Sequence, residues 1–321
     1  MIILISDTPV AGTVNRIARW LNQLSGIKCH ALIRRNYPHN AFRLDGGAFS
    51  VLPEWEKFIV QCVRKARVIF FHNIVDDKLS DIIFNTKPFN TKVYYQIHSP
   101  PLEPPLFDYQ VISDYPFDAI LAIAQGHGRF IQDAIVVPNI VADFTPPCEI
   151  KKNPLIFNPS IRSTSFRWSA KFTESDKKYL LANQDKIGNY RISKDVQQLF
   201  GREIVTHEEI LLYLQAVSIV IDDINTGLFH QTALEAIKAG CAVFSAADLE
   251  SIEEFCIAVN VDVPPFLYVY GIEDVVSMLA DRSFRKALPT IMDKSKEYAQ
   301  LYLSEKRLAQ CYWSQVKSLV K

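Results

Sequence analysis

Short apolar runs alternate with helical segments along most of the chain, and this alternation constrains the fold more than any other feature. The chain opens with a continuous apolar run at residues 2–5, and Ile17, Ala18, Leu21 and Leu24 follow it at helical spacing. Strands that are apolar throughout and separated by helices are typical of a parallel sheet with helices on both faces. The sequence therefore predicts an α/β fold.

The alternation occurs twice. In the first half we expect strands at 2–5, 29–33, 68–72, 92–98, 119–123 and 134–138. A stretch rich in Pro and Lys at 145–154 interrupts the pattern and is typical of a linker. In the second half we expect strands at 155–157, 203–205, 217–221 and 241–244, and helices at 174–184, 208–215, 231–239 and 249–256. The prediction is two Rossmann-like domains that face each other across a cleft, 1–147 and 148–290, with a C-terminal crossover helix at 291–321 that packs back on the first domain.

Composition excludes several classes of protein. The 321 residues are 49% hydrophobic, which excludes a disordered chain, and 35 basic residues balance 35 acidic ones. A net charge of zero provides no overall field that attracts nucleic acid. No run approaches the roughly 20 apolar residues of a membrane span. The first residues resemble a strand rather than a signal peptide, and six scattered cysteines form no CxxC pair, so we expect a cytoplasmic protein, with the inner face of the membrane as the alternative.

Ligands of open α/β sheets bind beyond the carboxyl ends of the strands, so candidate site residues are sought in the loops there. The loop at residues 6–13 contains Gly12 and Thr13 and leads into a helix that carries Arg16. Its backbone amides can bind an oxyanion or a sugar hydroxyl, and an ordinary turn is the alternative. One glycine is too few for a G-x-G-x-x-G pattern, so a nicotinamide-type dinucleotide site is poorly supported.

A second loop of the first half is stiffened by proline. It places His98 and Glu103 directly after a strand, among two Pro-Pro pairs. A histidine there can donate to a phosphate or a hydroxyl, and a histidine bonded to backbone is the alternative. His72 and Asn73 end the preceding strand and are weaker candidates.

A basic loop follows the first strand of the second half. Arg162, Arg167 and Lys171 lie within residues 159–171, together with five hydroxyl side chains. Arginine can hold a diphosphate with two hydrogen bonds, and lysine adds a point charge. The alternative is a solvated surface loop.

The most informative segment is residues 219–245. A strand ends at Asp222 and Asp223, a loop with one glycine follows, and Glu235 lies in the next helix. The amino end of that helix can bind a diphosphate through its amides, and Glu235 can accept hydrogen bonds from two ribose hydroxyls. The two aspartates are adjacent rather than spaced as DxD, so we infer no metal.

Residues 234–243, Leu-Glu-Ala-Ile-Lys-Ala-Gly-Cys-Ala-Val, resemble the LEAMAxGxPVV segment of retaining nucleotide-sugar glycosyltransferases with two Rossmann-like domains, the GT-B type, and of family 4 in particular. Val137-Pro-Asn139-Ile is similar to the interdomain VxPNGxD element of that group, and Gln96-Ile-His98 to its strand end. Arg167-Trp-Ser-Ala-Lys171 resembles the Arg and Lys pair that holds the donor diphosphate.

The resemblance implies roles for individual residues. It implies that Glu235 binds the nucleotide ribose, that Arg167 and Lys171 neutralise the departing diphosphate without a metal or other cofactor, and that His98, the fourth catalytic candidate, lies near the donor sugar. It also implies the donor-binding residues Arg162, Asp223, Thr226, Gly227, His230 and Thr232, and on the acceptor side Gly12, Thr13, Arg16 and Glu103.

The chain departs from the family at two places: the amino-terminal loop has one glycine where relatives often have two, and one acidic residue is missing. The family usually has two glutamates separated by seven residues, and that spacing places the first at Gly227, where no acid exists. Substitution by Asp222, Asp223, Thr226 or His230 is an open alternative.

We therefore expect an enzyme, a metal-independent and retaining hexosyl- or pentosyltransferase that moves a sugar from a nucleotide-diphosphate donor to a cell-surface polysaccharide, a lipid-linked or another glycan acceptor. Peripheral association with the membrane is an open expectation. One alternative is a phage-type glycosyltransferase that modifies DNA bases, but the zero net charge makes nucleic acid a disfavoured partner. The other is a non-catalytic sugar-nucleotide binding protein, which the missing acid at Gly227 favours.

Overall fold

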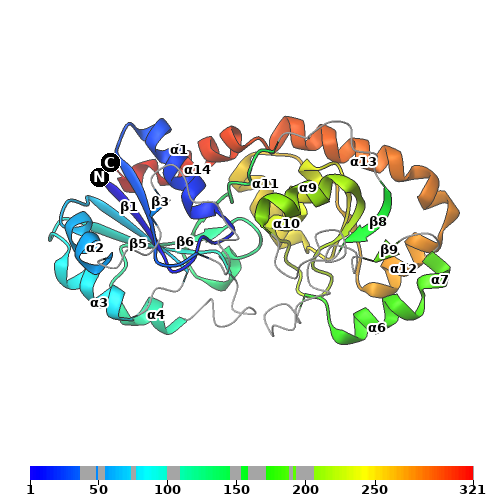
Figure 1. The fold of residues 1–321 in the computed structure, drawn as a ribbon, viewed down its shortest axis with the longest axis horizontal. Helices are drawn as coiled ribbons and strands as arrows, with labels where there is room; N and C mark the ends of the chain where they lie inside the picture. Colours follow the sequence, from blue (N-terminus) through cyan, green and yellow to red (C-terminus); the bar gives the residue numbers. More distant parts are fainter. Residues whose placement is uncertain are drawn as a thin grey trace. The chain divides into compact units, whose positions relative to one another are not determined.

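The structure is a computed structural model that describes residues 1–36, 48–49, 55–73, 77–99, 109–144, 153–157, 171–187, 191–192 and 206–320. The chain divides into two compact units (Figure 1). Unit 1 contains Met1–Ile140 and Lys306–Lys321, and unit 2 contains Val141–Glu305.

Unit 1 is built on a parallel sheet of seven strands in the order β3-β2-β1-β4-β5-β6-β7. The strands are β1 (Ile2–Ser6), β2 (Cys29–Ile33), β3 (Ala48–Phe49), β4 (Val68–His72), β5 (Lys92–Ile97), β6 (Ala119–Ile123) and β7 (Ile135–Val137). The helices are α1 (Thr13–Ser25), α2 (Trp55–Val63), α3 (Asp77–Thr86), α4 (Tyr109–Asp114) and α14 (Glu305–Val320), with a short 3₁₀ turn at Gly128–Phe130. The order reverses between β1 and β4, so the carboxyl ends of those strands form a topological switch point.

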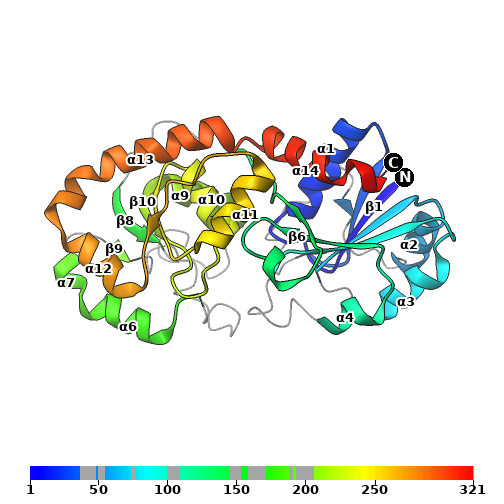
Figure 2. The same ribbon diagram turned by 180° about the vertical axis from the view of Figure 1, so that it is seen from behind.

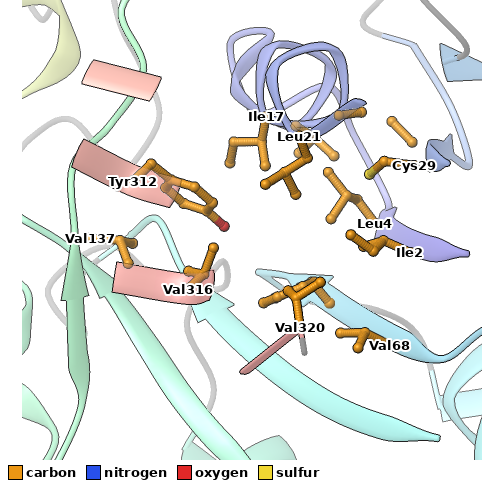
Figure 3. Close-up of a cluster of buried hydrophobic side chains, with 14 of the residues drawn as sticks. Ile2, Leu4, Ile17, Leu21, Cys29, Val68, Val137, Tyr312, Val316 and Val320 are labelled. Carbon is orange, nitrogen blue, oxygen red and sulfur yellow. The ribbon is translucent and has the colours of Figure 1, made fainter. Parts of the chain in front are cut away.

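Helices cover both faces of this sheet (Figures 1 and 2). On one face, α1 and α14 pack against strand residues, and Figure 3 shows Ile17, Leu21, Tyr312 and Val316 meeting in that cluster. On the other face, α2 and α3 bury apolar residues against the alternate positions of the same strands. Because successive side chains of a strand point to opposite faces, a strand buried on both sides must be apolar throughout, as residues 2–5 are.

Unit 2 contains a parallel sheet of five strands in the order β12-β11-β10-β8-β9. The strands are β8 (Asn153–Phe157), β9 (Arg191–Ile192), β10 (Val217–Ile221), β11 (Ala242–Ser245) and β12 (Leu267–Tyr268). The helices are α6 (Glu174–Ala182), α7 (Gln184–Ile187), α9 (His207–Ala216), α10 (Gln231–Lys238), α11 (Leu249–Val259), α12 (Ile272–Ala280) and α13 (Arg282–Tyr302). The prediction of an α/β fold is confirmed. The expectation that the two sheets face each other across a cleft stays a prediction.

Two features of the carboxyl-terminal segment differ from the expectation. One helix from residue 291 was expected, but α13 begins at Arg282 and runs through Pro289, and a break after Tyr302 separates it from α14. Residues 291–305 belong to unit 2, and only Lys306 onward packs on unit 1. The reason is the burial of Phe284, Leu288 and Met292 of α13 in the core of unit 2, whereas Tyr312, Val316 and Val320 of α14 are buried in unit 1. The boundary after the first unit likewise lies at Ile140 rather than at residue 147.

In the part of the chain that the structure describes, no helix has both the length and the apolar character needed to cross a bilayer.

Candidate functional site

Two adjacent carboxylates follow the central strand of unit 2. Asp222 and Asp223 come directly after β10, and both are buried. Asp222 accepts a hydrogen bond from the backbone N–H of His230 at 2.9 Å. Burial raises its pKa above the ordinary value, because His230 and Lys171 nearby only partly offset the loss of water.

Asp223 is in a different electrostatic environment. Its Oδ1 accepts from the backbone N–H groups of Asn225 and Thr226, both at 2.9 Å, and its Oδ2 accepts from the Thr226 hydroxyl. The Nε2 atom of His230 lies 3.0 Å from the same Oδ2. Burial opposes ionisation, but the hydrogen bonds from His230, Thr226 and Asn225 outweigh it and lower the pKa of Asp223. Asp223 is therefore a buried carboxylate that keeps its charge.

Lys171 reaches the same loop from the chain before α6. Its side chain is buried, and its Nζ lies 3.1 Å from Nδ1 of His230. Its carbonyl oxygen accepts from the backbone N–H of Ile224 and from Nδ2 of Asn225. The loop after β10 thus fixes the backbone of Lys171, and His230 contacts its ammonium.

Glu235 lies in α10, and its side chain is only 3% exposed. Its Oε1 accepts from Nε2 of Gln231 at 2.6 Å and lies 2.8 Å from Nε2 of His207. His207 is the first residue of α9, whose start is fixed by a capping box between Thr206 and Glu209. Thr232 lies in the first turn of α10 and is half-buried.

The backbone at Gly227 accounts for the absence of an acid there. Its φ is +77°, a conformation that residues with a side chain rarely adopt. A Cβ built on it would lie 2.6 Å from Oδ2 of Asp248, which caps α11 by accepting from the N–H of Ser251. The Gly227 carbonyl also accepts from Asp248 and Ser251. Any side chain at this position would add backbone strain and would require the Asp248 side chain that caps α11 to shift, so the loop favours glycine.

In unit 1, the candidate histidine forms a pair. Nε2 of His98 lies 2.8 Å from Nδ1 of His72, and both side chains are buried at the carboxyl ends of β5 and β4. Burial, and then the charge of Arg16, lower the pKa of His98 to about 3. Burial and the neighbouring His98 hold the pKa of His72 well below its usual value. Asn73, whose φ is +55°, accepts from the N–H of His98 and ties the two strand ends together.

The expected acceptor-side residues of α1 make internal contacts. Thr13 donates to Oδ1 of Asn139 at 2.9 Å, and Nε of Arg16 donates to the Ile140 carbonyl at 2.6 Å. Arg16 also donates to the Ala11 carbonyl, across a loop in which Val10, Ala11 and Gly12 have φ values of 48°, 48° and 78°. Arg16 and Thr13 thus fix the segment after β7 against the start of α1.

Three predicted site residues, Glu103, Arg162 and Arg167, lie outside the described residues. The structure brings Lys171, Asp223, Thr226 and His230 into one hydrogen-bonded cluster, and it places Glu235 one turn along α10 from its start. His98 belongs to unit 1.

The sequence did not predict the roles of His207 and Gln231. A polar residue at the start of a helix gives no indication of which distant side chain it will contact. Within the described ranges no three His, Cys, Asp or Glu side chains are grouped to hold a metal ion.

Comparisons with known proteins identify the fold. No family model and no curated protein matches the chain. A glycosyltransferase from Rickettsia africae ESF-5 is 13% identical, over 100% of this chain and 98% of its own, with a TM-score of 0.58. WaaG, a glycosyltransferase involved in lipopolysaccharide biosynthesis, is 12% identical, with 97% and 99% covered and a TM-score of 0.54. MnaA from S. aureus, solved with UDP, is 12% identical, with 99% and 96% covered and a TM-score of 0.52.

These likenesses, at low identity, concern architecture. The chain has two Rossmann-like units of the GT-B type, which confirms the expected fold class. Membership of family 4 and a retaining mechanism stay predictions.

Proposed function

We propose that this chain is a glycosyltransferase that takes a sugar from a nucleoside-diphosphate donor. The observation that carries the proposal is that a buried ammonium contacts the residue that begins α10, and that a buried carboxylate lies on the same helix. Lys171 contacts His230, the residue before the first turn, and Glu235 follows in the second turn. A diphosphate requires positive charge and N–H donors, and a ribose requires an acceptor for its hydroxyls. Two of the architecturally similar proteins are glycosyltransferases, which supports the same assignment.

The chemistry follows from this charge distribution. The bond between the anomeric carbon and the diphosphate oxygen breaks, and the electron pair leaves with the diphosphate. Lys171 and the amides of α10 stabilise the negative charge that develops there, in a site already oriented before the reaction. The acceptor oxygen bonds to the anomeric carbon, and its proton passes to the departing diphosphate. The ammonium and the helix dipole supply charge that a metal would otherwise bring, so we propose a metal-independent reaction. The resemblance of residues 234–243 to retaining enzymes supports a retaining one.

The acceptor and the location belong to the proposal as well. A cell-surface polysaccharide or lipid-linked acceptor is supported by the likeness to WaaG, which is involved in lipopolysaccharide biosynthesis. We propose action in the cytoplasm, at the inner face of the membrane, with unit 1 on the acceptor side. We also keep the roles that the sequence suggests for four further residues. His98 lies near the donor sugar, Arg162 and Arg167 bind the donor, and Glu103 is on the acceptor side.

Two substitutions separate the roles of Lys171 and Glu235. Lys171→Met should weaken binding of a nucleoside diphosphate by about 10- to 150-fold and change binding of the bare nucleoside little, because a hydrogen bond to a charged group contributes roughly 1.5–3 kcal/mol. Glu235→Gln should weaken both ligands alike, because both contain the ribose. Calorimetric titration with UDP, GDP, ADP and their nucleosides measures this. Lys238→Met is the matched control, since Lys238 is on the same helix but pairs with Asp143 at 2.6 Å.

Activity distinguishes the enzyme from a binding protein. The protein is incubated with a panel of nucleotide sugars and glycan acceptors, with and without EDTA. Nucleoside diphosphate should be released, and this activity should persist in the presence of the chelator. Binding of nucleotides without any transfer or hydrolysis would favour the non-catalytic alternative. A product in which the sugar stays on the nucleotide would point to a different reaction.

A further inference from the structure

A buried chain of three side chains, Lys171–His230–Asp223, crosses the start of α10. Nζ of Lys171 lies 3.1 Å from Nδ1 of His230, and Nε2 of the same ring lies 3.0 Å from Oδ2 of Asp223. The two ends have little contact with water, since Lys171 is 4% exposed and Asp223 is 0% exposed. The cation and the anion are therefore joined through one imidazole.

The donor and acceptor roles in this chain follow from the chemistry of its ends. An ammonium has only N–H donors, so Lys171 donates to Nδ1, which must lack a proton. The ring proton is then on Nε2, which donates to Asp223. Asp223 keeps its charge because hydrogen bonds from Thr226 and Asn225 also lower its pKa. The geometry therefore selects a neutral His230 with its proton on Nε2.

His230 is used in an unusual way for its position. It is the N-cap of α10, yet its side chain caps none of the helix N–H groups. Its backbone N–H donates to Asp222 instead, and its ring extends between Lys171 and Asp223. The side chain of this N-cap residue therefore contacts Lys171 instead of capping the helix.

We propose that His230 and Asp223 are positioning residues, which hold the Lys171 ammonium at the amino end of α10 in the orientation that binds the donor diphosphate. This rests on the proposed function, and it identifies how the charge is oriented rather than which residue carries it. Lys171 has a flexible stem and three rotatable donors, so an unheld ammonium would lose orientation. Contact with Nδ1 uses one donor and fixes the direction of the group, while Asp223 fixes the ring.

Two conservative variants separate the two ends of the chain. His230→Asn places an amide oxygen near the position of Nδ1, so it can still accept from Lys171. His230→Gln places an amide N–H near the position of Nε2, so it can still donate to Asp223. We expect His230→Gln to weaken UDP binding about tenfold and His230→Asn about threefold at most, with uridine binding unchanged in both. Tyr298→Phe, which removes a hydroxyl bonded to the Asp262 carbonyl of the same unit, is the control for a general loss of stability.

A readout without ligand tests the chain itself. Long-range ¹H–¹⁵N spectra of the full protein labelled at histidine should show His230 as the Nε2–H tautomer at pH 8, and Lys171→Met should shift its Nδ1 resonance. An Nδ1–H tautomer in the wild type would overturn the chain. Equal UDP affinity in wild type and His230→Gln, or a larger loss in His230→Asn, would overturn the positioning role alone.

The proposed function fails by a different result. If the wild type bound none of UDP, GDP, ADP or dTDP, the phosphate role of Lys171 would be wrong together with that of its positioning residues, whatever the tautomer of His230.

Discussion

Nδ1 of His72 lies 2.8 Å from Nε2 of His98, so two buried imidazoles at neighbouring strand ends face each other. Both have pKa values below the ordinary one, so the folded protein keeps them neutral in mild acid. The unfolded chain takes up protons on both rings below about pH 6.5. The contribution of this pair to the free energy of unfolding is therefore constant above that pH. It falls as the pH decreases from about 6.5 towards 3, the folded pKa of His98.

His98→Gln removes one of these groups and should flatten the pH dependence. Each depressed histidine costs up to about 1.4 kcal/mol per pH unit in this window. Between pH 6.5 and 5.0 the wild type should therefore lose about 1–2 kcal/mol more than the variant, measured by urea unfolding. Between pH 7.5 and 8.5 the two should show the same slope. A wild type whose acid slope equals that of the variant would show that His98 is protonated in the folded state.

Gly227→Ala should destabilise unit 2 beyond the cost of backbone strain. The left-handed φ of +77° contributes about 1 kcal/mol, and the contact with Asp248 adds to it. Gly26→Ala is the matched control, because its φ is +67° and nothing lies within 4 Å of the added Cβ. Thermal unfolding should give a loss for Gly227→Ala about twice that for Gly26→Ala. Equal losses would mean that Asp248 moves aside at no cost.

Tyr312→Phe should loosen α14 from unit 1. The buried Tyr312 hydroxyl donates to Oε1 of Gln96 at 2.6 Å, so its removal leaves a buried acceptor without a partner and costs about 1–3 kcal/mol. Tyr94→Phe removes a part-buried bond to the Leu319 carbonyl and should cost less. Hydrogen exchange of the α14 amides measures both. Unchanged protection in Tyr312→Phe would show that apolar packing alone holds the helix.

Arg16→Lys should destabilise unit 1 by about 2–3 kcal/mol, although the charge is kept. The guanidinium donates to the Ile140 and Ala11 carbonyls from a rigid fork that a single ammonium does not reproduce. Arg19→Lys, at a half-buried position one turn later, is the control and should change stability little. Urea unfolding of both variants measures the difference. A wild-type midpoint in Arg16→Lys would leave Arg16 available for the acceptor role expected from sequence.

Most of the longer strands in the described ranges were predictable, because burial on both faces demands unbroken apolar runs, and the strand expected at 203–205 lies outside those ranges. The run at 217–221 coincides with β10, and the runs at 29–33 and 68–72 coincide with β2 and β4. Short strands such as β3 and β12 were missed, since two residues carry no periodicity. The start of α13 was missed because Pro289 lies inside it, where a proline normally predicts a helix end.

The candidate site was only partly predictable. Position after a strand indicated Asp223, His230 and Glu235, because parallel strands end at one edge. Their partners could not be inferred, because His207 and Glu235 are 28 residues apart and Lys171 and His230 are 59 apart. Such contacts depend on how loops from different strands meet, and no local pattern records that.

Unit 1 is assembled from two pieces of chain that unit 2 separates. During synthesis, the face of the first sheet that α14 covers must wait until Val141–Glu305 has been made. At ribosomal speeds that delay is on the order of ten seconds or more, during which residues such as Leu4, Val68 and Val137 lack their final cover. Most of unit 1 is therefore translated before unit 2, but it can finish folding only after unit 2 has been translated, and an expressed fragment ending at Ile140 would need residues 306–320 supplied as a separate peptide.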